Sequence, residues 1–392
     1  MGKQITKTVT WVGKIDWELK TFHGEELSTH KGSSYNAYLI RDEKNVLIDT
    51  VWGPYDREFV AGLEKEIDLN KIDYVIVNHT EPDHSGALLE LLQKIPNVPI
   101  YCTANAAKFL KAQYHKEWNC NIVKTGDALP IGKNTLHFIE APMLHWPDTM
   151  FTYMEGENIL FSNDGFGQHY ATEMLFNDEA DEEEMLKEAL KYYANILAPF
   201  NKMVNAKVKQ VLAMNLKIDM IAPSHGVIWR KNPAKIVEKY LEWSDNFKKN
   251  QITILYDTMW QSTRKMAQLI ARGIQNKDKE VVVKLYNMSK EDKNDILTEV
   301  FASKMIIVGS PTINNGYSYA TAGILEMLKG MKLSAKKAAS FGSYGWSGEA
   351  CTKIEKELKD AGLEIIKPGL KQTWNPDEEQ AKEAIAWGES LV

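Results

Sequence analysis

The stretch from Val75 to His84 constrains the fold of this chain more than any other part of the sequence. The β-favouring residues 74–77 predict a short buried strand. Four side chains with metal-ligand chemistry follow within six positions, namely His79, Glu81, Asp83 and His84. Two imidazoles and two carboxylates crowded at the end of a strand would repel and desolvate one another, and a bound cation removes that cost. We therefore predict a metal site. In an extended loop every second side chain points the same way, so His79, Glu81 and Asp83 can turn toward one point, and Asp83 and His84 offer a second pair.

Three later segments, residues 143–147, 161–165 and 222–226, can complete the ligand shell. Each places one candidate ligand just after an apolar run, namely His145, Asp164 and His225. Together with the first stretch, these residues form a ligand set that suits two metal ions.

The order His-x-Glu-x-Asp-His, followed by single His, Asp and His ligands, resembles that of the metallo-β-lactamase superfamily. The hydrolases of that superfamily carry His where this chain has Glu81. A carboxylate in that position hardens the ligand set and adds negative charge, which shifts the metal preference from zinc toward iron and stabilises ferric iron. With this exchange the chain resembles the flavodiiron proteins, also called A-type flavoproteins, over residues 78–85, 140–149 and 222–230.

The resemblance implies a role for each candidate ligand. His79, Glu81 and His145 would bind one iron ion, Asp83 and His225 would bind the other, and Asp164 would bridge the two. His84 would lie beside the second ion, either as a ligand or turned away with water in its place. The resemblance also places three candidate proton donors near the diiron pocket, namely His23, His169 and Tyr193. Members of the family bring the FMN of one chain to the iron of another, which implies a head-to-tail homodimer or a dimer of dimers.

A chain of 392 residues exceeds what one hydrophobic core usually encloses, so we expect two domains of about 150–250 residues. A change of pattern near residue 249 divides the chain into residues 1–249 and 250–392. In the first part short strands alternate with helices, which fits the αββα sandwich of a metallo-β-lactamase-like domain that the resemblance implies.

Residues 250–392 alternate regularly between strand and helix patterns. Five strands are expected at residues 252–256, 281–284, 304–308, 338–341 and 364–366, and each is followed by a helical segment. This alternation predicts an α/β domain with a doubly wound, five-stranded parallel sheet, and its size favours the flavodoxin-like form.

Three loops at the carboxyl ends of these strands are suited to a flavin. Residues 257–263 place hydroxyl groups before a helix, where backbone N–H groups and the helix dipole can hold a phosphate. The loop lacks the Walker-type lysine of nucleoside triphosphate sites, so a monophosphate fits better. Residues 310–316 offer amide groups, and residues 342–348 offer glycines for close approach and an aromatic ring to cover the flavin. We therefore predict FMN, bound by Thr258, Met259, Trp260, Ser262, Thr263, Ser310, Pro311, Thr312, Ile313, Asn314, Asn315, Ser343, Tyr344, Gly345, Trp346 and Gly348.

Composition and charge exclude several function classes. A net charge of -6 without a lysine-rich stripe argues against nucleic-acid binding. No apolar run approaches the roughly 20 residues that span a bilayer, so we expect no membrane segment and a cytoplasmic protein. The three cysteines, Cys102, Cys120 and Cys351, lack Cys-x-x-Cys spacing and predict neither a disulfide framework nor an iron–sulfur site. The electron donor is therefore expected to be external, and the resemblance suggests rubredoxin or reduced deazaflavin F420.

The electron count favours a diatomic gas as substrate. Two ferrous ions and one reduced FMN together hold the four electrons that convert O₂ to water, and the diferrous pair alone holds the two that convert two NO to N₂O. The resemblance thus implies an oxidoreductase acting on O₂, NO or both. The alternatives are a zinc metallo-hydrolase with a fused flavodoxin domain and a flavodoxin-type electron carrier with a structural metal site. Glu81 argues against the first, and an open coordination position argues against the second.

Overall fold

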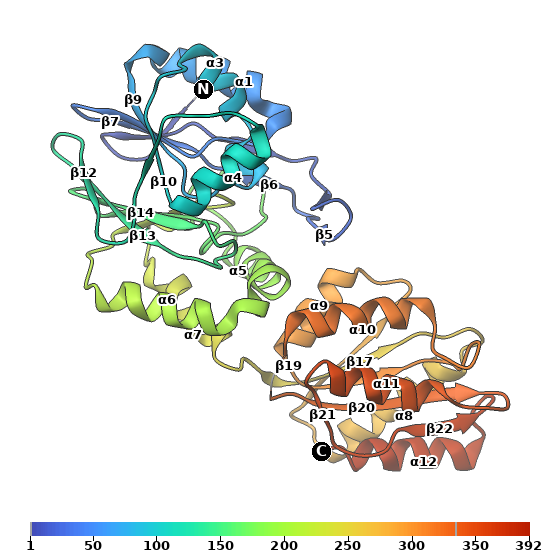
Figure 1. Cartoon of the computed structure of the whole chain (residues 1–392). Helices are drawn as coiled ribbons and strands as arrows, with labels where there is room; N and C mark the ends of the chain where they lie inside the picture. The colour runs from blue at the N-terminus through green and yellow to red at the C-terminus, as the bar shows by residue number, and fades with distance from the viewer. Residues whose placement is uncertain (1, 334) are drawn as a thin grey trace. The chain divides into compact units, whose positions relative to one another are not determined.

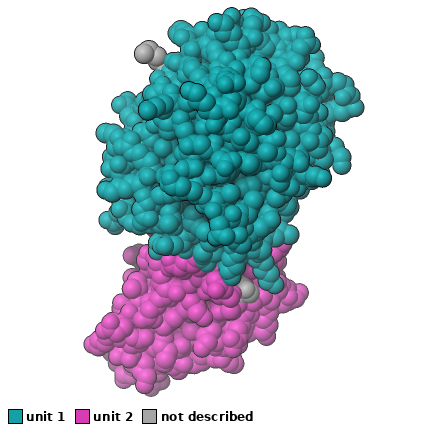
Figure 2. Space-filling model, turned by 90° about the vertical axis from the view of Figure 1, so that its left-hand side faces the viewer, with its two compact units in different colours: residues 1–192, 200–241 teal, residues 193–199, 242–392 magenta. Residues whose placement is uncertain are grey.

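The computed structural model describes residues 2–333 and 335–392 (Figure 1). The chain forms two compact units, shown in different colours in Figure 2. The first unit comprises residues 1–192 and 200–241, and the second comprises residues 193–199 and 242–392. The short segment 193–199 therefore belongs with the C-terminal unit although its neighbours in sequence belong to the first.

Two mixed β-sheets form the centre of the first unit. The larger sheet has the order β1 (Lys3–Gln4), β2 (Val9–Trp11), β7 (Tyr38–Arg41), β8 (Asn45–Ile48), β9 (Ile72–Ile76), β10 (Ile100–Cys102) and β11 (Cys120–Ile122). The smaller sheet has the order β12 (Ala128–Pro130), β13 (Thr135–Glu140), β14 (Met150–Glu155), β15 (Ile159–Asn163) and β16 (Met220–Pro223). Both sheets are antiparallel at one end and parallel at the other. The parallel pairs run from β8 to β11 in the larger sheet and join β15 to β16 in the smaller sheet.

A shared core joins the two sheets of the first unit. Ile40, Ile48 and Ile76 of the larger sheet and Phe138 and Phe161 of the smaller sheet belong to one cluster of buried apolar side chains. The side chains of neighbouring positions alternate between the two faces of a strand, so each sheet can direct one apolar row into this cluster.

Helices flank the two sheets of the first unit (Figure 1). They are α1 (Asp56–Glu66), α2 (Pro82–Ser85), α3 (Leu88–Lys94) and α4 (Ala104–Tyr114) near the larger sheet, and α5 (Glu182–Tyr192), α6 (Asn201–Ala213) and α7 (Ala234–Ser244) near the smaller one. The αββα sandwich expected of this part of the chain is confirmed. Two small hairpins complete the unit, pairing β3 (Lys14–Asp16) with β6 (Ser33–Tyr35) and β4 (Thr21–Phe22) with β5 (Leu27–Ser28).

The second unit contains a parallel sheet in which five positions are occupied in the order β18, β17, β19, β20 and β21. The strands are β17 (Lys249–Tyr256), β18 (Val282–Asn287), β19 (Ser303–Gly309), β20 (Lys337–Tyr344) and β21 (Glu364–Ile365). The predicted doubly wound sheet is confirmed. One strand was missed, because β22 (Leu370–Thr373) continues the fifth position and pairs with β20 beyond β21.

Five helices cover this sheet, namely α8 (Ser262–Lys277), α9 (Lys293–Ala302), α10 (Tyr319–Met331), α11 (Ala350–Asp360) and α12 (Glu378–Glu389). Asp377 caps the start of α12 by accepting a hydrogen bond from the backbone N–H of Gln380, whose side chain reciprocates. α8 and α12 approach closely through two glycines, since a Cβ on Gly273 would lie 2.0 Å from the carbonyl oxygen of Ile385.

Among the described residues, none of the helices combines the length and the hydropathy that crossing a membrane requires.

Candidate functional site

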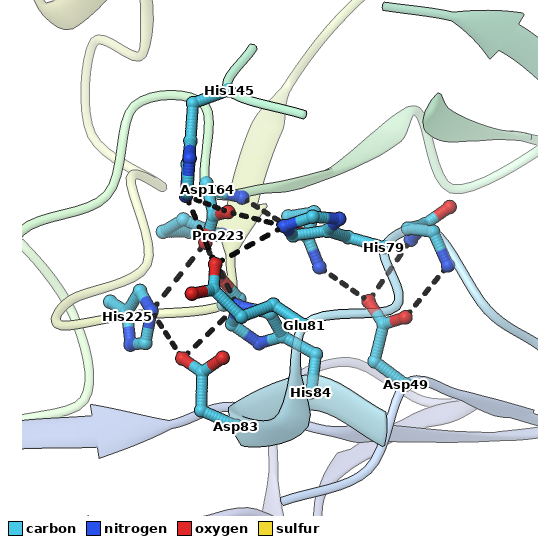
Figure 3. A network of polar contacts seen from close by, with 12 residues as sticks. Asp49, His79, Glu81, Asp83, His84, His145, Asp164, Pro223 and His225 are labelled. Carbon is cyan, nitrogen blue, oxygen red and sulfur yellow. Dashed lines mark hydrogen bonds and ion pairs between the residues drawn. The ribbon is translucent and has the colours of Figure 1, made fainter. Parts of the chain in front are cut away.

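Four of the candidate metal ligands of the first unit lie in loops that each follow a different strand. His79 follows β9, His145 follows β13, Asp164 follows β15 and His225 follows β16. The four loops come from both sheets, and their ligand side chains point toward one another (Figure 3). The prediction that these segments come together rested on the types of side chain, on their positions after apolar runs and on the resemblance, and the structure brings all seven candidate ligands together.

Residues 82–85 form the short helix α2, where the sequence had suggested an extended loop. Pro82 occupies the start of this helix, where its fixed φ and missing N–H are favourable. The helix separates the ligands into two groups. His79 and Glu81, which precede Pro82, belong to one group, whereas Asp83 and His84, within the helix, belong to another. The extended loop was therefore wrong over residues 82–85, whereas the division of the ligands into two groups is the one that the resemblance implied.

The first group comprises His79, Glu81, His145 and Asp164, which offer ligand atoms within 4.8 Å of one another. Glu81 Oε2 lies 3.3 Å from His79 Nε2 and 3.2 Å from His145 Nε2. Asp164 Oδ2 lies 3.3 Å from His145 Nε2 and 3.6 Å from His79 Nε2. Two imidazole nitrogens and two carboxylate oxygens thus converge, which is a set of ligands that suits iron.

The second group comprises Asp83, His84 and His225. Asp83 Oδ2 lies 3.2 Å from His84 Nε2 and 3.1 Å from His225 Nε2. The other oxygen of Asp164, Oδ1, lies 3.0 Å from His84 Nε2 and 3.5 Å from His225 Nε2. His84 therefore points into this group rather than away from it.

Asp164 lies between the two groups and turns one oxygen toward each (Figure 3). Ser224 donates a hydrogen bond of 2.9 Å to Asp164 Oδ1, which holds the carboxylate in this orientation. The geometry is that of a carboxylate able to bridge two cations.

Buried polar atoms without hydrogen bonds are concentrated in these groups. They include both oxygens of Asp83, both ring nitrogens of His84 and Oδ2 of Asp164. Native proteins pair nearly all of their buried polar atoms, because an unpaired one costs roughly 1–3 kcal/mol. Coordination to metal ions would satisfy these atoms, so the residues present fit a two-metal centre.

The clustered imidazoles and carboxylates shift one another's pKa values. Burial opposes the charged form, yet the nearby carboxylates of Asp83 and Asp164 raise the pKa of His84 to about 9. The pKa of His145 also rises to about 9, because Asp164 and Glu81 outweigh its burial. Burial likewise opposes the charged form of Asp164, but the charge of His84 and the contact with His145 hold its pKa well below the usual value. The cluster thus favours charged carboxylates, the form that binds a cation.

Two carboxylates that the sequence analysis missed support the ligand loops. Asp148 Oδ2 lies 3.1 Å from His79 Nδ1 and accepts hydrogen bonds of 2.8 Å from both the backbone N–H and the hydroxyl of Thr80. Asp49 accepts hydrogen bonds from the backbone and side chain of Asn78 and from the side chain of Asn163 (Figure 3). Burial raises the pKa of Asp49 to about 6. The sequence signal for both was weak, since Asp49 is a single acidic residue after an apolar run and Asp148 is a single acidic residue in the loop after His145.

Two of the three candidate proton donors lie beside the ligand groups. His23, in the hairpin between β4 and β5, places Nε2 2.7 Å from Glu81 Oε1. His169 is buried with its ring centroid 4.8 Å from that of His225, and its Nδ1 lies 2.8 Å from Ser33 Oγ. Burial, followed by the charges of His225 and His23, lowers the pKa of His169 well below the usual value.

The third candidate, Tyr193, lies elsewhere. Its ring packs against Trp243 and Phe301 in the second unit, at centroid distances of 5.4 and 5.7 Å. The preceding residue, Tyr192, is the one beside the ligands, with its ring 5.0 Å from that of His169. Burial raises the pKa of Tyr192 well above its usual value, so its hydroxyl stays protonated.

The second unit contains a cavity of about 780 Å³ at the carboxyl ends of β17, β19, β20 and β22. Twelve of the residues predicted to bind FMN line it: Thr258, Met259, Trp260, Ser262, Pro311, Thr312, Asn314, Asn315, Ser343, Tyr344, Gly345 and Trp346. Ser347, Trp374 and Asn375 complete the lining. The sequence analysis missed Trp374 and Asn375 because it did not foresee β22, which ends directly before them.

Four residues predicted to bind FMN do not line this cavity. Thr263 is buried and exchanges a hydrogen bond of 2.8 Å with Ser343. The hydroxyl of Ser310 is likewise used internally, because it donates to the carbonyl of Pro311 and accepts from the backbone N–H of Ser318. The remaining two are Ile313, which lines a neighbouring hollow, and Gly348, which has a φ of +79° in the third loop.

The features of this cavity fit a flavin phosphate. The hydroxyl of Thr258 is buried without a hydrogen-bond partner. The start of α8 at Ser262 has no side-chain cap, which leaves backbone N–H groups free to bind an anion. Trp260 and Trp346 are each 87% exposed and Trp374 is 65% exposed, so large aromatic rings surround the opening. These rings can cover an isoalloxazine.

The comparisons with known proteins agree with this architecture. The model of the ODP family beta lactamase matches residues 34–226, and the model of the flavodoxin family matches residues 254–388. The anaerobic nitric oxide reductase flavorubredoxin of Aliivibrio fischeri is 55% identical, over 97% of this chain and 77% of its own length. The protein of the same name from Escherichia coli K12 is 52% identical, over 97% of this chain and 80% of its own length. The chain belongs to the flavodiiron family.

Solved structures of this family share the whole fold with the present flavodiiron protein. Rubredoxin oxygen:oxidoreductase from Desulfovibrio gigas is 34% identical with a TM-score of 0.96, covering 100% of this chain and 98% of its own. The flavodiiron protein from Giardia intestinalis is 34% identical with a TM-score of 0.94, covering 100% and 96%. This flavodiiron protein is thus an oxidoreductase, as predicted, and family membership favours that class over the hydrolase and carrier alternatives.

Proposed function

We propose that this flavodiiron protein reduces nitric oxide to N₂O, and O₂ to water, at a diiron centre that is supplied with electrons by FMN. The observation that carries the proposal is the pair of ligand groups that share Asp164. The named relatives support NO as substrate, since those from Aliivibrio fischeri and Escherichia coli are nitric oxide reductases, whereas the Desulfovibrio gigas relative is named for oxygen.

In this proposal each ligand group holds one iron ion. His79, Glu81 and His145 hold the first, Asp83, His84 and His225 hold the second, and Asp164 is common to both. His84 is included because its Nε2 points at Asp83 and Asp164. When bound, the two irons and FMN supply the electrons of the reaction.

The protein's own residues would provide a mainly apolar approach for the gas. An open hollow of about 700 Å³ lies beside His145 and is lined by Phe109, Ala112, Gln113, Met143, Trp146, Pro147 and Phe200. A mainly apolar lining favours small uncharged molecules over water and ions. Protons would come from His23, which contacts Glu81, because the lowered pKa of His169 and the raised pKa of Tyr192 disfavour both as donors.

We further propose that Thr258, Ser262 and the start of α8 hold the phosphate of FMN, and that the exposed tryptophans at the cavity cover its ring. We also propose a head-to-tail homodimer or a dimer of dimers, in which the exposed Trp260 and Trp346 would lie near the partner subunit. Electrons would enter from an external donor such as rubredoxin or reduced F420.

The test is a rapid-mixing experiment. The protein is loaded with iron and FMN, reduced under anaerobic conditions, and mixed with NO or O₂ while the flavin absorbance is followed. We expect rapid flavin reoxidation with both gases, with N₂O as the product of NO. Asp164→Asn serves as the control that lacks the shared carboxylate. Reoxidation by neither gas, or equal rates in the control, would refute the proposal, and a zinc-only centre of full occupancy would favour the hydrolase.

A further inference from the structure

The two ligand groups offer closely matched sets of ligands. Each contains two imidazoles and one carboxylate of its own, and each receives one oxygen of Asp164. Apart from the exchange of Glu81 for Asp83, the groups differ in the residues behind the ligands.

Those residues differ sharply between the groups. In the first group, the outer ring nitrogen of His79, Nδ1, lies 3.1 Å from the Asp148 carboxylate. In the second group, the outer nitrogen of His225 lies 2.7 Å from the backbone carbonyl of Ser34, a neutral acceptor. The outer nitrogen of His84 has no hydrogen-bond partner in the described part of the chain.

Asp148 is held in place independently of His79. Its Oδ2 accepts two further hydrogen bonds of 2.8 Å, both from Thr80, and the side chain is fully buried. Its backbone carbonyl accepts a hydrogen bond of 2.9 Å from Thr103, the residue that caps α4. The carboxylate is therefore a fixed acceptor against which the ring of His79 must orient.

A fixed acceptor at Nδ1 has two consequences for His79. The proton of a neutral imidazole stays on Nδ1, so the lone pair of Nε2 faces Glu81 and Asp164. A negative acceptor also makes the imidazole a stronger electron donor to a metal ion than a neutral carbonyl does. The carbonyl of Ser34 can fix the tautomer of His225 in the same way, so it is the negative charge of the acceptor that acts on the first group alone.

We propose that Asp148 is a positioning residue that fixes the Nδ1–H tautomer of His79 and selectively strengthens metal binding by the group His79, Glu81, His145 and Asp164. The inference rests on the two-metal centre proposed above. It goes beyond that centre by making its two positions inequivalent, with the difference set by one residue that binds no metal.

The test measures metal affinity at each group separately. The full-length chain is stripped of metal and titrated with Co²⁺ alone, whose absorption bands report binding. The His225→Ala background leaves the first group to be measured, and the His145→Ala background leaves the second. Asp148→Asn is introduced into both backgrounds, because the amide is isosteric and keeps an oxygen acceptor but loses the charge.

We expect Asp148→Asn to lower the Co²⁺ affinity about 10–100-fold in the His225→Ala background. In the His145→Ala background the affinity should stay within about twofold, as for an independent site. Asp148→Ala should lower the affinity of the first group further, because the ring of His79 then loses its acceptor.

Two controls separate positioning from a merely structural role. Thr80→Val removes one hydrogen bond to Asp148 but keeps its charge, so it should weaken the first group less than Asp148→Asn does and leave the second group within about twofold. Asp42→Asn alters a carboxylate that accepts hydrogen bonds from Lys133 and Asn134 in the same unit, and it should change neither affinity. In Zn²⁺-loaded protein with ¹⁵N-labelled histidine, the Nδ1–H signal of His79 should persist in Asp148→Asn and disappear in Asp148→Ala.

Equal weakening of both groups by Asp148→Asn would show that Asp148 only braces a loop, and would overturn the inference. No weakening of either group would overturn it as well. Failure of the unsubstituted chain to bind Co²⁺ at either group would instead refute the metal centre itself. The two failures are thus distinguishable.

Discussion

Asp164 is the residue on which the geometry of the candidate metal centre depends most. Its Oδ2 faces His145 and its Oδ1 faces His84, so one side chain belongs to both ligand groups. We predict that Asp164→Asn weakens metal binding at both groups by at least about 100-fold. Losing a direct ligand should cost more affinity than losing a residue that only hydrogen-bonds to a ligand, which costs about 10–100-fold. Metal analysis of the purified variant measures this.

Asp42→Asn provides a comparison, because it removes a carboxylate outside the metal centre and should retain its full metal content. A variant at Asp164 that keeps both metal ions would show that the side chain does not bridge them.

A second prediction at the residue scale concerns Thr258. Its hydroxyl is buried and unpaired, so Thr258→Val should leave the stability of the flavin-free protein equal or higher. The same change should weaken FMN binding about 10-fold or more, because a hydrogen bond to a charged group contributes about 1.5–3 kcal/mol. Titration by flavin fluorescence quenching measures the affinity. Ser340→Ala, which removes a hydroxyl bonded to Glu355 outside the cavity, should show the opposite pattern of reduced stability and normal FMN binding.

The residue types that bind metals were predictable because their chemistry is rarely compatible with burial in any other role. Asp148 was not predictable, since a single acidic residue gives no sign of what it faces. Tyr192 and Tyr193 show a second limit. They are adjacent and of the same type, and only the change from α5 to the wider helical turn over Tyr193–Leu197 determines which of them faces His169.

At the scale of whole elements, the C-terminal unit was predictable because its strands and helices alternate in sequence as they do in space. The short elements were not. β22 is only four residues long, and its partner β20 lies in the interior of the chain, so neither length nor spacing marked it. α2 was missed for a related reason, because four residues cannot display a helical period.

The contact between α8 and α12 yields a prediction at this scale. Gly273→Ala would place a methyl group 2.0 Å from the carbonyl oxygen of Ile385, so the helices must move apart. We expect a loss of about 1–3 kcal/mol in the stability of the second unit. Gly323→Ala, in α10, meets no atom within 4 Å and should instead stabilise the unit by up to about 1 kcal/mol. Denaturant unfolding followed by flavin release at fixed FMN concentration measures both. Equal effects of the two changes would contradict the close approach.

At the scale of the whole molecule, the proposed head-to-tail dimer can be tested by mixing two inactive chains. Asp164→Asn removes the metal centre, and Ser262→Asp places a negative charge where the flavin phosphate would bind at the start of α8. If the flavin of one chain serves the irons of its partner, mixing the two variants and letting the folded subunits exchange should restore activity in the mixed dimers. About a quarter of the wild-type rate is expected for a random mixture of symmetric dimers. A mixture that stays inactive, although subunit exchange is verified, would show that each chain works alone.

The ligands of the metal centre come from four loops spread between His79 and His225, and none of these loops holds more than part of a shell. An ion can therefore bind only to the folded first unit, and its binding energy adds directly to the stability of that unit. Treatment with a chelator should lower the melting temperature of the first unit and leave that of the flavodoxin-like unit unchanged. Calorimetry would show this as a shift of one unfolding transition while the other stays in place. The thermal stability of the first unit would then depend on the concentration of available iron.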